Sequence, residues 1–551
     1  MSQRNSPFLC LPVDIQHLVL SNLSPKDILL CRLICKGLEG LTKERSIWIA
    51  HCRGNITSKG HPFPTYTPLN AMSLSELEHH AVNCFRVAQK WLCFAHGRSE
   101  KFPDGDFATC ETVTIKEVYE GVPIYATHYL NIHGRLLLLI VYKAIWSVLD
   151  LWDVTDPTNP TKICEWTTKG SIIKALVVNK DPSSEATIAL GVYTEAQEHV
   201  VQLLTVTSSL CLEILLSIPS IFVPLTLKGD LVALCKGTQS RTVIWNWKSS
   251  RYAMLDGELA EDGAINTRSE DASEEPSGSR PRFEHNYPLE VTFAHGGVLI
   301  GRTKSFTLHR TPELRHSSFE EAETAPTGYL AKHTFGYLDS ICTTADEPHD
   351  ADTPPSYRIL TRGYTDDPWR EQDEHSLHVH RLDFNLDFLE HPSTTVPYLF
   401  PPVHEARIPT RRGKLNCRKI FLSKKGVALW VQPKKWEGPY PGYAPVPLIN
   451  VASSDPDEPG RISWVRMGDW EREKEYVRAA ILPGSVYRLA DDGSKGTALL
   501  GEGTDGEVNV RPVLLKTNRC LEADWTSMDW DEEAGRIVLG HQDGMVMLIE
   551  M

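Results

Sequence analysis

The chain lacks the sequence signs of a secreted protein. Its thirteen cysteines contain no Cys-x-x-Cys pair, so reduced thiols are a simpler interpretation than a disulfide framework or a thiolate metal site. Its first residues have no signal-peptide architecture, because Pro12 and Asp14 interrupt the apolar run. We therefore expect a protein of the cytoplasm, the nucleus or both.

Positive charge and long apolar runs are also scarce. The 57 Lys and Arg against 71 Asp and Glu give a net charge of −14, whereas nucleic-acid binding needs a basic surface that displaces counterions. The apolar stretches at 136–151 and 210–227 carry charged or proline residues, and each divides into a pair of strands rather than a membrane span. We expect no nucleic-acid partner and no membrane partner.

Signatures of catalysis and of metal binding are missing as well. The chain has no phosphate-binding loop and no Gly-x-Ser-x-Gly nucleophile turn. His378 and His380 would share one face of a strand, which is a possible metal pair, but no third ligand is marked near them. We expect a non-catalytic protein with no cofactor and no metal.

The overall composition is that of a globular protein with more than one unit. Hydrophobic residues make up 41% of the chain and charged residues 23%, which is neither a disordered nor a fibrous composition. At 551 residues the chain is long for a single core. We expect two units joined by a connecting segment.

Helix signals dominate residues 9–48. Pro12 occupies a first-turn position with Asp14 close behind it at the positive end of the helix dipole. The segment beginning at Ser24 repeats this pattern, with Pro25 opening the helix and Asp27 in its first turn. We predict helices at about 12–20 and 25–34, and a third, weaker helical segment around 37–41.

These helices carry more apolar surface than three short helices can bury. The large apolar residues are Leu11, Ile15, Leu18, Leu20, Leu23, Ile28, Leu29, Leu33, Ile34, Leu38, Leu41, Ile47 and Trp48. Burying one such side chain contributes about 1.5–3 kcal/mol while ordering each residue costs about 1–2 kcal/mol, so a partner surface is expected. That surface belongs either to the rest of this chain, as for an ordinary helical cap, or to another protein. Cys31 and Cys35, one helical turn apart, are predicted to be small core residues.

The order of residues in this segment resembles an F-box. The matching residues are Leu11-Pro12-x-Asp14-Ile15, Leu20-Ser21-x-Leu23, Pro25-x-Asp27-Ile28-Leu29, Cys31-Arg32-Leu33-Ile34-Cys35-Lys36, Leu41 and Ile47-Trp48. The resemblance implies docking on the Skp adaptor of a cullin-based ubiquitin ligase, while the domain after the F-box recruits the substrate protein. It also implies adaptor-facing or core roles for Leu11, Pro12, Ile15, Leu20, Leu23, Leu29, Leu33, Cys35, Lys36, Leu41 and Trp48. Gly37 and Gly40 depart from the family pattern and leave the length of the third helix open.

A connecting segment comes after the helical module, which we bound at 6–52. Residues 53–110 begin with a loop rich in proline and glycine and continue as a helix at about 73–92. Ser73 and Glu76 have the spacing of a capping box. We expect this helix to join the helical module rigidly to the C-terminal part of the chain.

From about residue 111 the chain consists of short β-rich runs. Compact apolar runs occur at 135–142, 186–193, 230–236, 297–302, 357–362, 426–432, 476–482 and 536–540, and most are followed by a more alternating strand, as at 146–154 and 199–207. Such a repeat is typical of a radially arranged sheet. We predict an all-β propeller of seven or eight blades over 111–551, and therefore an α+β multidomain chain.

Two tryptophan-containing segments resemble the third strand of a WD-repeat blade, namely Asp150-Leu151-Trp152-Asp153 and Ile244-Trp245-Asn246-Trp247. Asp543-Gly544 is predicted to close a final hairpin. The acidic insertion at 256–282 is predicted to be disordered. Loops rich in proline and aromatic residues at 397–409 and 433–447 are either a recognition surface or the cover of a blade edge.

This interpretation is compatible with three functions. The first is a substrate-recognition subunit of an SCF-type ubiquitin ligase, with the Skp adaptor and through it a cullin as partners, and an unidentified protein substrate. The second is a propeller scaffold for protein–protein interaction with no ubiquitin role. The third is a propeller hydrolase, which would need convergent polar groups at the central channel.

Overall fold

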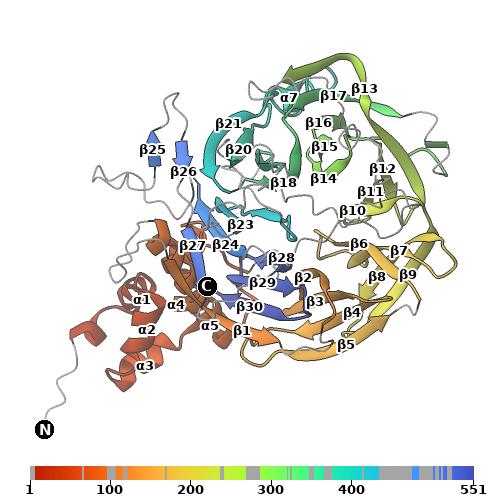
Figure 1. The fold of residues 1–551 in the computed structure, drawn as a ribbon. Coiled ribbons are helices and arrows are strands. Elements are labelled where there is room, and N and C mark those ends of the chain that lie inside the picture. Colours follow the sequence, from red (N-terminus) through yellow and green to blue (C-terminus); the bar gives the residue numbers. More distant parts are fainter. Residues whose placement is uncertain are drawn as a thin grey trace, which may run out of the picture.

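The structure of the protein is a computed structural model. It describes residues 7–551 apart from 65–67, 96–106, 116–118, 120, 168–169, 236–240, 269–285, 319–320, 323–325, 347–352, 365–374, 412–414, 434–474, 483–484, 486–499, 503–507, 511–512 and 518–523. A small group of helices at the N-terminal end lies beside a ring of β-sheets (Figure 1). The chain is thus a helical module, a connecting helix and a mostly β region.

The helical part contains more elements than the sequence predicts. The elements are η1 Pro7–Cys10, α1 Val13–Ser21, α2 Pro25–Cys31, α3 Lys36–Thr42, α4 Arg45–His51, η2 Cys52–Thr57 and α5 Leu74–Ala95. The start signal at Ser24 is confirmed, because the Ser24 hydroxyl accepts a hydrogen bond from the Asp27 N–H at 3.2 Å. Pro12 marks the start of α1 one residue early, since it is the N-cap and Val13 is the first helical residue. A further short helix, α7 Asp387–Glu390, lies in the β region.

The second helix is shorter than predicted. The prediction that Cys31 and Cys35 share one face of that helix is therefore wrong. The helix α2 ends at Cys31, and the next N–H groups bond three residues back, as from Ile34 to the Cys31 carbonyl at 3.2 Å. Such bonds tighten the last turn of a helix and stop its extension. Cys35 instead stands at the N-cap of α3.

Helical structure also continues past Trp48 into the segment predicted to be a loop. The helix α4 is followed directly by the single-turn element η2. Trp48, Cys52 and Ile56 are all fully buried, and their spacing of four residues places them on one face of a continuing helix. The buried side of this helix therefore continues into the segment whose glycine and polar residues suggested a loop.

The connecting helix α5 belongs to two hydrophobic cores. The predicted capping box is present, with the Ser73 N–H donating to the Glu76 carboxylate at 2.6 Å and the Glu76 N–H donating to the Ser73 hydroxyl at 3.3 Å. Leu77 and Ala81 pack with Trp48 in the core of the helical module. One to three turns further on, Val87, Ala88 and Trp91 pack in a core of the β region.

All but two of the described strands, β25 Leu500–Glu502 and β26 Val508–Val510, form seven units of four antiparallel strands. Units 1 to 3 are β2 Ile124–Ile132, β3 Arg135–Lys143, β4 Ser147–Asp153 and β5 Thr161–Thr167; β6 Ile172–Val178, β7 Ile188–Tyr193, β8 His199–Val206 and β9 Leu212–Pro219; and β10 Val223–Lys228, β11 Leu231–Cys235, β12 Thr242–Asn246 and β13 Arg251–Arg268. Units 4 and 5 are β14 Pro288–Ala294, β15 Gly297–Arg302, β16 Ser305–Arg310 and β17 Thr327–Thr334; and β18 Leu338–Ala345, β19 Tyr357–Gly363, β20 Ser376–Leu382 and β21 Val403–Pro409. Units 6 and 7 are β22 Ile420–Leu422, β23 Val427–Pro433, β24 Glu475–Ile481 and β27 Val513–Thr517; and β28 Trp525–Asp531, β29 Arg536–His541, β30 Val546–Glu550 and β1 Phe107–Ile115.

The units succeed one another around the ring (Figure 1), and the first and last strands of the β region meet in unit 7. The strand β1 comes from the N-terminal side and pairs antiparallel with the last strand, β30, with Val113 opposite Leu548. The first strands of units 1 and 7 also meet, since the Tyr129 N–H donates to the Asp529 carboxylate at 2.7 Å. Two short strands, β25 Leu500–Glu502 and β26 Val508–Val510, extend unit 5 at its outer edge.

The first strands of six units share one irregularity near their start. The pairing register with the second strand shifts by one residue, at Tyr125, Lys174, Leu225, Leu289, Asp339 and Thr526. A bulge of this kind adds local twist and redirects the side chain of the extra residue. Its recurrence at equivalent positions indicates that the units are repeats of one structural plan.

The predicted strands are largely confirmed, but the first strands of most units were missed; β10, in the stretch at 210–227 predicted to be a pair of strands, is an exception. The run at 135–142 is β3 and the run at 297–302 is β15, each the second strand of its unit. First strands such as β28 alternate buried and half-buried side chains and include polar residues, so they lack the apolar run used as the signal. The runs at 426–432 and 476–482 are neighbours in unit 6, where β23 pairs with β24, and do not start separate groups.

The tryptophan-containing segments lie where the sequence places them. Trp152 is near the end of β4 and Trp245 near the end of β12, each the third strand of its unit. Both indoles are buried. Gly544, with a φ of 95°, lies in the turn between β29 and β30, where glycine has no steric penalty. The predicted final hairpin is confirmed.

Two predicted loops are partly strands. The prediction of disorder is wrong for 256–268, because β13 continues to Arg268 and pairs in parallel with β17, for example Ile265 with Ala331. Backbone hydrogen bonds to a strand edge need no apolar side chains, so composition did not reveal this pairing. Residues 397–409 include the strand β21 and the fully buried Tyr398. Residues 269–282 and most of 433–447 lie outside the described residues.

Candidate docking site

The helical module presents an exposed set of large apolar side chains. Of the nine residues of α1, only Gln16, Leu20 and Ser21 are buried. The exposed set, here called the apolar face, consists of Leu11, Val13, Ile15, Leu18 and Val19 in and just before α1, Leu30 in α2, and Leu33 and Ile34 in the turn after α2. Leu33 is 82% exposed and Ile34 is 70% exposed. A monomeric protein rarely leaves so many neighbouring aliphatic side chains in water.

The predicted site residues divide into three groups in the structure. Exposed are Leu11, Pro12, Ile15, Leu33 and Lys36; half-buried are Leu23, Leu29, Cys35 and Leu41; buried are Leu20 and Trp48. The buried pair belongs to the internal packing of the module rather than to its surface. Only the exposed and half-buried residues can touch a partner without rearrangement.

Five residues of the apolar face are not among the predicted site residues: Val13, Leu18, Val19, Leu30 and Ile34. Leu18 and Ile34 were counted among the apolar residues that need a partner surface, but were given no adaptor-facing role. All five are apolar, as core residues are, and periodicity reports burial without saying which partner supplies it. The signal that was available was the crowding of the segment, because α1 has apolar residues on more than one side. That crowding could have marked α1 as a helix with both an internal and an external apolar contact.

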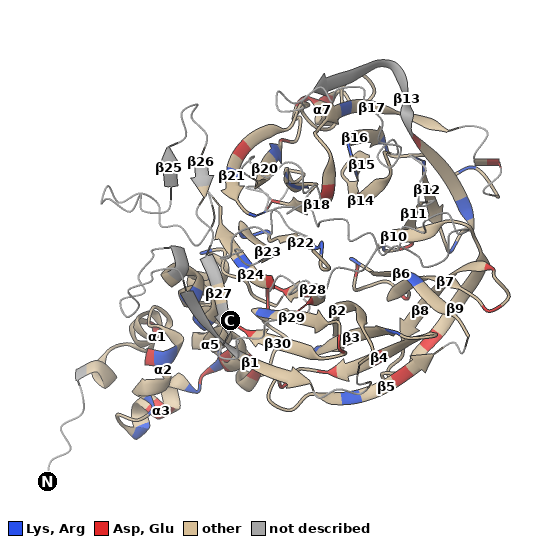
Figure 2. Cartoon of the chain, viewed as in Figure 1, with Lys and Arg blue, Asp and Glu red and all other residues tan. Residues whose placement is uncertain are grey.

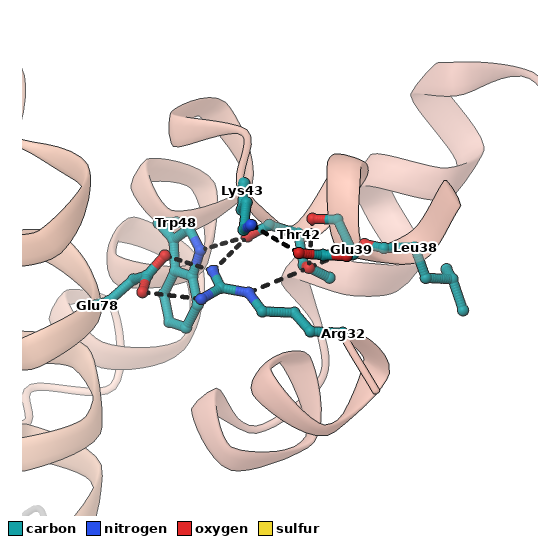
Figure 3. A network of polar contacts seen from close by, with 7 residues as sticks. All are labelled: Arg32, Leu38, Glu39, Thr42, Lys43, Trp48 and Glu78. Atoms are coloured by element: carbon teal, nitrogen blue, oxygen red, sulfur yellow. Dashed lines mark hydrogen bonds and ion pairs between the residues drawn. The ribbon is translucent and has the colours of Figure 1, made fainter. Parts of the chain in front are cut away.

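Arg32 ties the helical module to the connecting helix (Figure 3). Its guanidinium forms an ion pair with Glu78 of α5, in which Nη1 lies 3.1 Å from Oε2. The same group donates to the Thr42 carbonyl at 2.8 Å and to the Thr42 hydroxyl at 3.3 Å. A planar fork of donors suits this double task. One side chain therefore joins α2, the end of α3 and α5.

Trp48 contributes two further contacts to this network. Its indole N–H donates to the Thr42 carbonyl at 2.9 Å, and the Arg32 guanidinium lies 5.9 Å from the centre of its ring. A cation over an indole face is attracted by the ring quadrupole. Trp48 is thus a structural anchor of the module, and the polar contacts around it fix the orientation of α2 and α3.

The connecting helix is attached equally firmly to the β region. The Asn83 amide donates to the Ala534 carbonyl at 3.2 Å, and Arg86 forms an ion pair with Glu550. Val87 lies so close to Gly535, which has a φ of 66°, that a Cβ there would lie 2.4 Å from a Val87 methyl carbon. Contacts at both ends of α5 hold the apolar face at a set position relative to the ring.

The charges of the module do not form a single-sign patch. Figure 2 shows Lys and Arg together with Asp and Glu along α2 and α3, and both signs around the ring. His17 and Glu44 lie 2.8 Å apart across α1 and α4. Burial raises the pKa of the Cys52 thiol to about 12, which keeps it protonated and unreactive at neutral pH. The Cys52 thiol is therefore a buried group of the module's core rather than a nucleophile.

The histidine pair predicted as a possible metal site has a third histidine beside it. His378 and His404 approach to 3.2 Å between Nδ1 and Nε2, and the His380 ring centre lies 5.1 Å from that of His404. His404 was missed because it lies in β21, in the segment predicted to be a loop. Within the described residues, however, no group of three His, Cys, Asp or Glu side chains could hold a metal ion.

Ionisable groups also meet where the first strands of units 1 and 7 approach the start of unit 6. Lys419 Nζ lies 3.4 Å from His128 Nε2, and His128 Nδ1 lies 3.9 Å from the Asp529 carboxylate. Burial raises the pKa of Asp529 to about 6 and holds the pKa of His128 well below its ordinary value. These groups bond to one another and to the backbone, so their evident effect is to join three units of the ring.

This arrangement indicates a protein of the docking class, in which a helical module with an exposed apolar face is held rigidly beside a ring of sheets. Comparison with protein families identifies an F-box domain at residues 8–50, and the largely β region comes after it. Such a domain implies binding of a Skp-type adaptor and suggests a substrate adaptor of an SCF-type ligase. A comparison with curated proteins finds none that matches this chain. Among the helices that the structure describes, none has the length and apolarity needed to cross a bilayer.

Proposed function

We propose that this chain is the substrate-recognition subunit of an SCF-type ubiquitin ligase. In this proposal, the apolar face docks on the Skp-type adaptor, the adaptor connects the chain to a cullin, and the ring of sheets holds the target protein. The chain itself performs no covalent step. It raises the effective concentration of the target beside the ubiquitin-loaded enzyme.

The observation that carries this proposal is the exposure of the apolar face within the F-box match. Leu33 is 82% exposed and Ile15 is 43% exposed, although both belong to the motif. Burial of a large aliphatic side chain contributes about 1.5–3 kcal/mol. Five of the eleven residues to which the resemblance gives adaptor-facing or core roles are thus exposed and available to a partner, whereas an ordinary helical cap would have buried them against its own chain.

We also propose that the seven units are the blades of a seven-bladed, WD-repeat-like propeller. Three observations support this: the succession of four-strand antiparallel units, the bulge repeated near the start of six first strands, and the closure of unit 7 by β1 and β30. Closure by the first and last strands of the β region leaves few free sheet edges. The rigid attachment of α5 would then place a bound target at a set distance from the adaptor.

The test uses substitutions that remove the apolar face without disturbing the core. The double variant Ile15→Glu and Leu33→Glu should lose adaptor binding by roughly a hundredfold or more, because two partner-buried aliphatic groups become charged. The measurement is a titration of the full chain with purified Skp-type adaptor.

The matched control is Leu386→Glu with Leu399→Glu. These leucines are 62% and 50% exposed but lie in the β20–β21 connection of the ring. The control variant should bind the adaptor as the unaltered chain does. If Ile15→Glu with Leu33→Glu leaves adaptor affinity unchanged, the ligase proposal fails and a scaffold without a ubiquitin role becomes the better interpretation.

A further inference from the structure

The two ends of the ring differ in what they carry. The four strands of each unit alternate in direction, so the first and third strands end, and the second and fourth begin, at one end of the ring, while the opposite ends of these strands lie at the other. The helix α5 contacts Ala534, in a first-to-second turn, so that end is here called the α5 end and the opposite one the far end. The equivalent ends of neighbouring units coincide, because their corresponding strands pair in parallel, as β13 does with β17.

At the far end of units 1 and 2, two exposed lysines lie over tyrosine rings. Lys143 Nζ is 5.0 Å from the ring centre of Tyr125, and Lys174 Nζ is 5.7 Å from that of Tyr193. Tyr125 and Lys174 are the bulge residues of their strands. The Tyr125 hydroxyl donates to the Lys174 carbonyl at 2.5 Å. The bulges thus bring a lysine and a tyrosine from each unit into one continuous row.

Exposed apolar side chains stand at both ends of this row. Ile145 and Trp146, in the turn after Lys143, are 84% and 41% exposed. At the other end Ile221 is 57% exposed, and the N–H of its neighbour Ser220 donates to the His199 carbonyl at 2.9 Å. The His199 ring in turn lies 4.8 Å from that of Tyr193. The row therefore runs from the β3–β4 turn of unit 1 to the β9–β10 connection.

Lys143 and Lys174 differ from Lys162 and Lys248, two other lysines that lie over aromatic rings. Among the described residues, neither Lys143 nor Lys174 has a carboxylate at ion-pair distance. Lys162 is ion-paired with Asp150 at 2.9 Å, and Lys248, at the α5 end, is ion-paired with Asp230 at 3.0 Å. Lys304, which lies 4.4 Å from the Tyr337 ring centre, also has no carboxylate at ion-pair distance among the described residues, but it is half-buried. The far-end row thus presents positive charges that are positioned by aromatic rings and have no carboxylate partner within the described part of the chain, on a protein whose net charge is −14.

We propose that the far-end row binds an anionic segment of a partner protein that also carries apolar side chains. The two lysines would pair with its anionic groups, and Trp146 and Ile221 would receive apolar residues on either side. Aromatic rings that hold a lysine in place reduce the entropy lost on binding. This inference rests on the proposed function, in which the ring recruits the target, and it names the class of target segment.

A negative charge at the same end of the ring would repel an anionic ligand, and its removal supplies a second test. Glu195, in the β7–β8 turn, lies over Gly170, where its carboxylate oxygen is 2.8 Å from the place of a Cβ. Together with the exposed Glu198 it limits the positive potential of the row. This mixed charge also makes the row a poorer match for an anionic membrane surface than for a peptide that can place its charges at the lysines.

The test measures the fluorescence anisotropy of labelled peptides mixed with the full chain. The probes are repeats of Glu-Glu-Leu, of Lys-Lys-Leu, and of Glu-Glu-Leu with phosphoserine replacing one glutamate. The unaltered chain should bind the two acidic peptides and not the basic one, with affinity that falls as salt rises. A tighter phosphoserine complex identifies phosphate as the preferred anion, and equal affinities identify carboxylate.

Substitutions at the row decide the proposal. Lys143→Glu with Lys174→Glu should weaken acidic-peptide binding about tenfold or more, and Glu195→Gln should strengthen it by about twofold. The matched control Lys248→Glu changes a ring-stacked lysine at the α5 end and should have no effect. Circular dichroism and thermal melting of each variant separate lost binding from lost fold.

Three results would overturn the inference: no binding of either acidic peptide to the unaltered chain, equal weakening by Lys248→Glu, or preferential binding to phosphatidylserine vesicles that depends on the same two lysines. Adaptor titration of the same variants keeps the two proposals apart. Retained adaptor binding with lost peptide binding assigns the effect to the row. The Ile15→Glu and Leu33→Glu variant, which should lose adaptor binding, should still bind the acidic peptides.

Discussion

The contact between Arg32 and Glu78 predicts how strongly the helical module is held to the connecting helix. Their side chains are 19% and 20% exposed, so both charges are largely shielded from water. Removing one partner of a well-buried ion pair costs about 3–5 kcal/mol, and one hydrogen bond to a charged group is worth about 1.5–3 kcal/mol. The Thr42 carbonyl keeps the Trp48 indole as a donor when Arg32 is removed, which lowers the penalty.

We therefore expect Arg32→Met, which keeps most of the aliphatic volume, to reduce the free energy of opening of the module by about 2–4 kcal/mol. Glu78→Gln keeps the shape of the partner and removes its charge. A double-mutant cycle of these two substitutions should give a coupling energy of about 1–3 kcal/mol. The measurement is native-state hydrogen exchange of the amides in α2, α3 and α4, with the amides of the ring as an internal reference.

The control lies in the same network. Lys43 and Glu39 form an ion pair at 2.7 Å, but their side chains are 55% and 45% exposed, and solvent screens such a pair. Lys43→Met should leave exchange in the module unchanged. The reasoning is refuted if Arg32→Met and Lys43→Met have the same effect, or if the effects of Arg32→Met and Glu78→Gln simply add.

Two further predictions concern burial. Leu20→Ala, at 1% exposure, should lower the free energy of unfolding of the module by about 2–5 kcal/mol, whereas Leu33→Ala, at 82% exposure, should leave thermal stability unchanged and weaken adaptor affinity; differential scanning fluorimetry and adaptor titration separate the two. Burial raises the pKa of Glu475 to about 8 although the Trp525 N–H donates to it at 3.0 Å. Because the pKa of Glu475 is raised in the folded state, its contribution to stability is lost as the pH rises from about 4.5 to 8. Glu475→Gln should therefore stabilise the ring at pH 8 and not at pH 4, as measured by denaturant titrations at the two pH values. An equal effect at both pH values would contradict the raised pKa of Glu475.

Local signals along the chain predict elements well where the chemistry is local. Ser24 caps α2 and the Ser73–Glu76 box starts α5, because a cap is made by residues a few positions apart. Second strands such as β3 were found because they are buried on both faces. Most first strands were missed, since their burial depends on neighbours in adjacent units that are far away in sequence.

The candidate docking site could be predicted only in part from the sequence. Resemblance to the F-box selects motif positions, but it does not separate Leu20, which the module buries, from Leu33, which it exposes. Both are leucines in short helical segments with similar spacing. The distinction depends on how α1, α2 and α4 pack, and periodicity does not contain that information.

Likewise, composition did not distinguish disorder from pairing at an edge. The acidic segment after Leu255 is depleted in large apolar residues, yet β13 continues through 256–268 by backbone pairing with β17. A strand edge offers hydrogen bonds to any sequence that reaches it. Only the proximity of β17, which comes from a later part of the chain, makes that pairing possible.

By itself, the sequence determined that this protein has a helical module with an excess of apolar surface, a capped connecting helix and a long series of short strands. Those properties arise from capping residues, turn residues and apolar spacing, all of which act over a few positions. The tertiary structure alone decided which apolar residues face water, which strands close the ring, and which lysines lie over tyrosine rings with no carboxylate partner among the described residues. Each of these depends on the approach of residues distant in sequence, whose packing and charge pairing arise only in the folded chain.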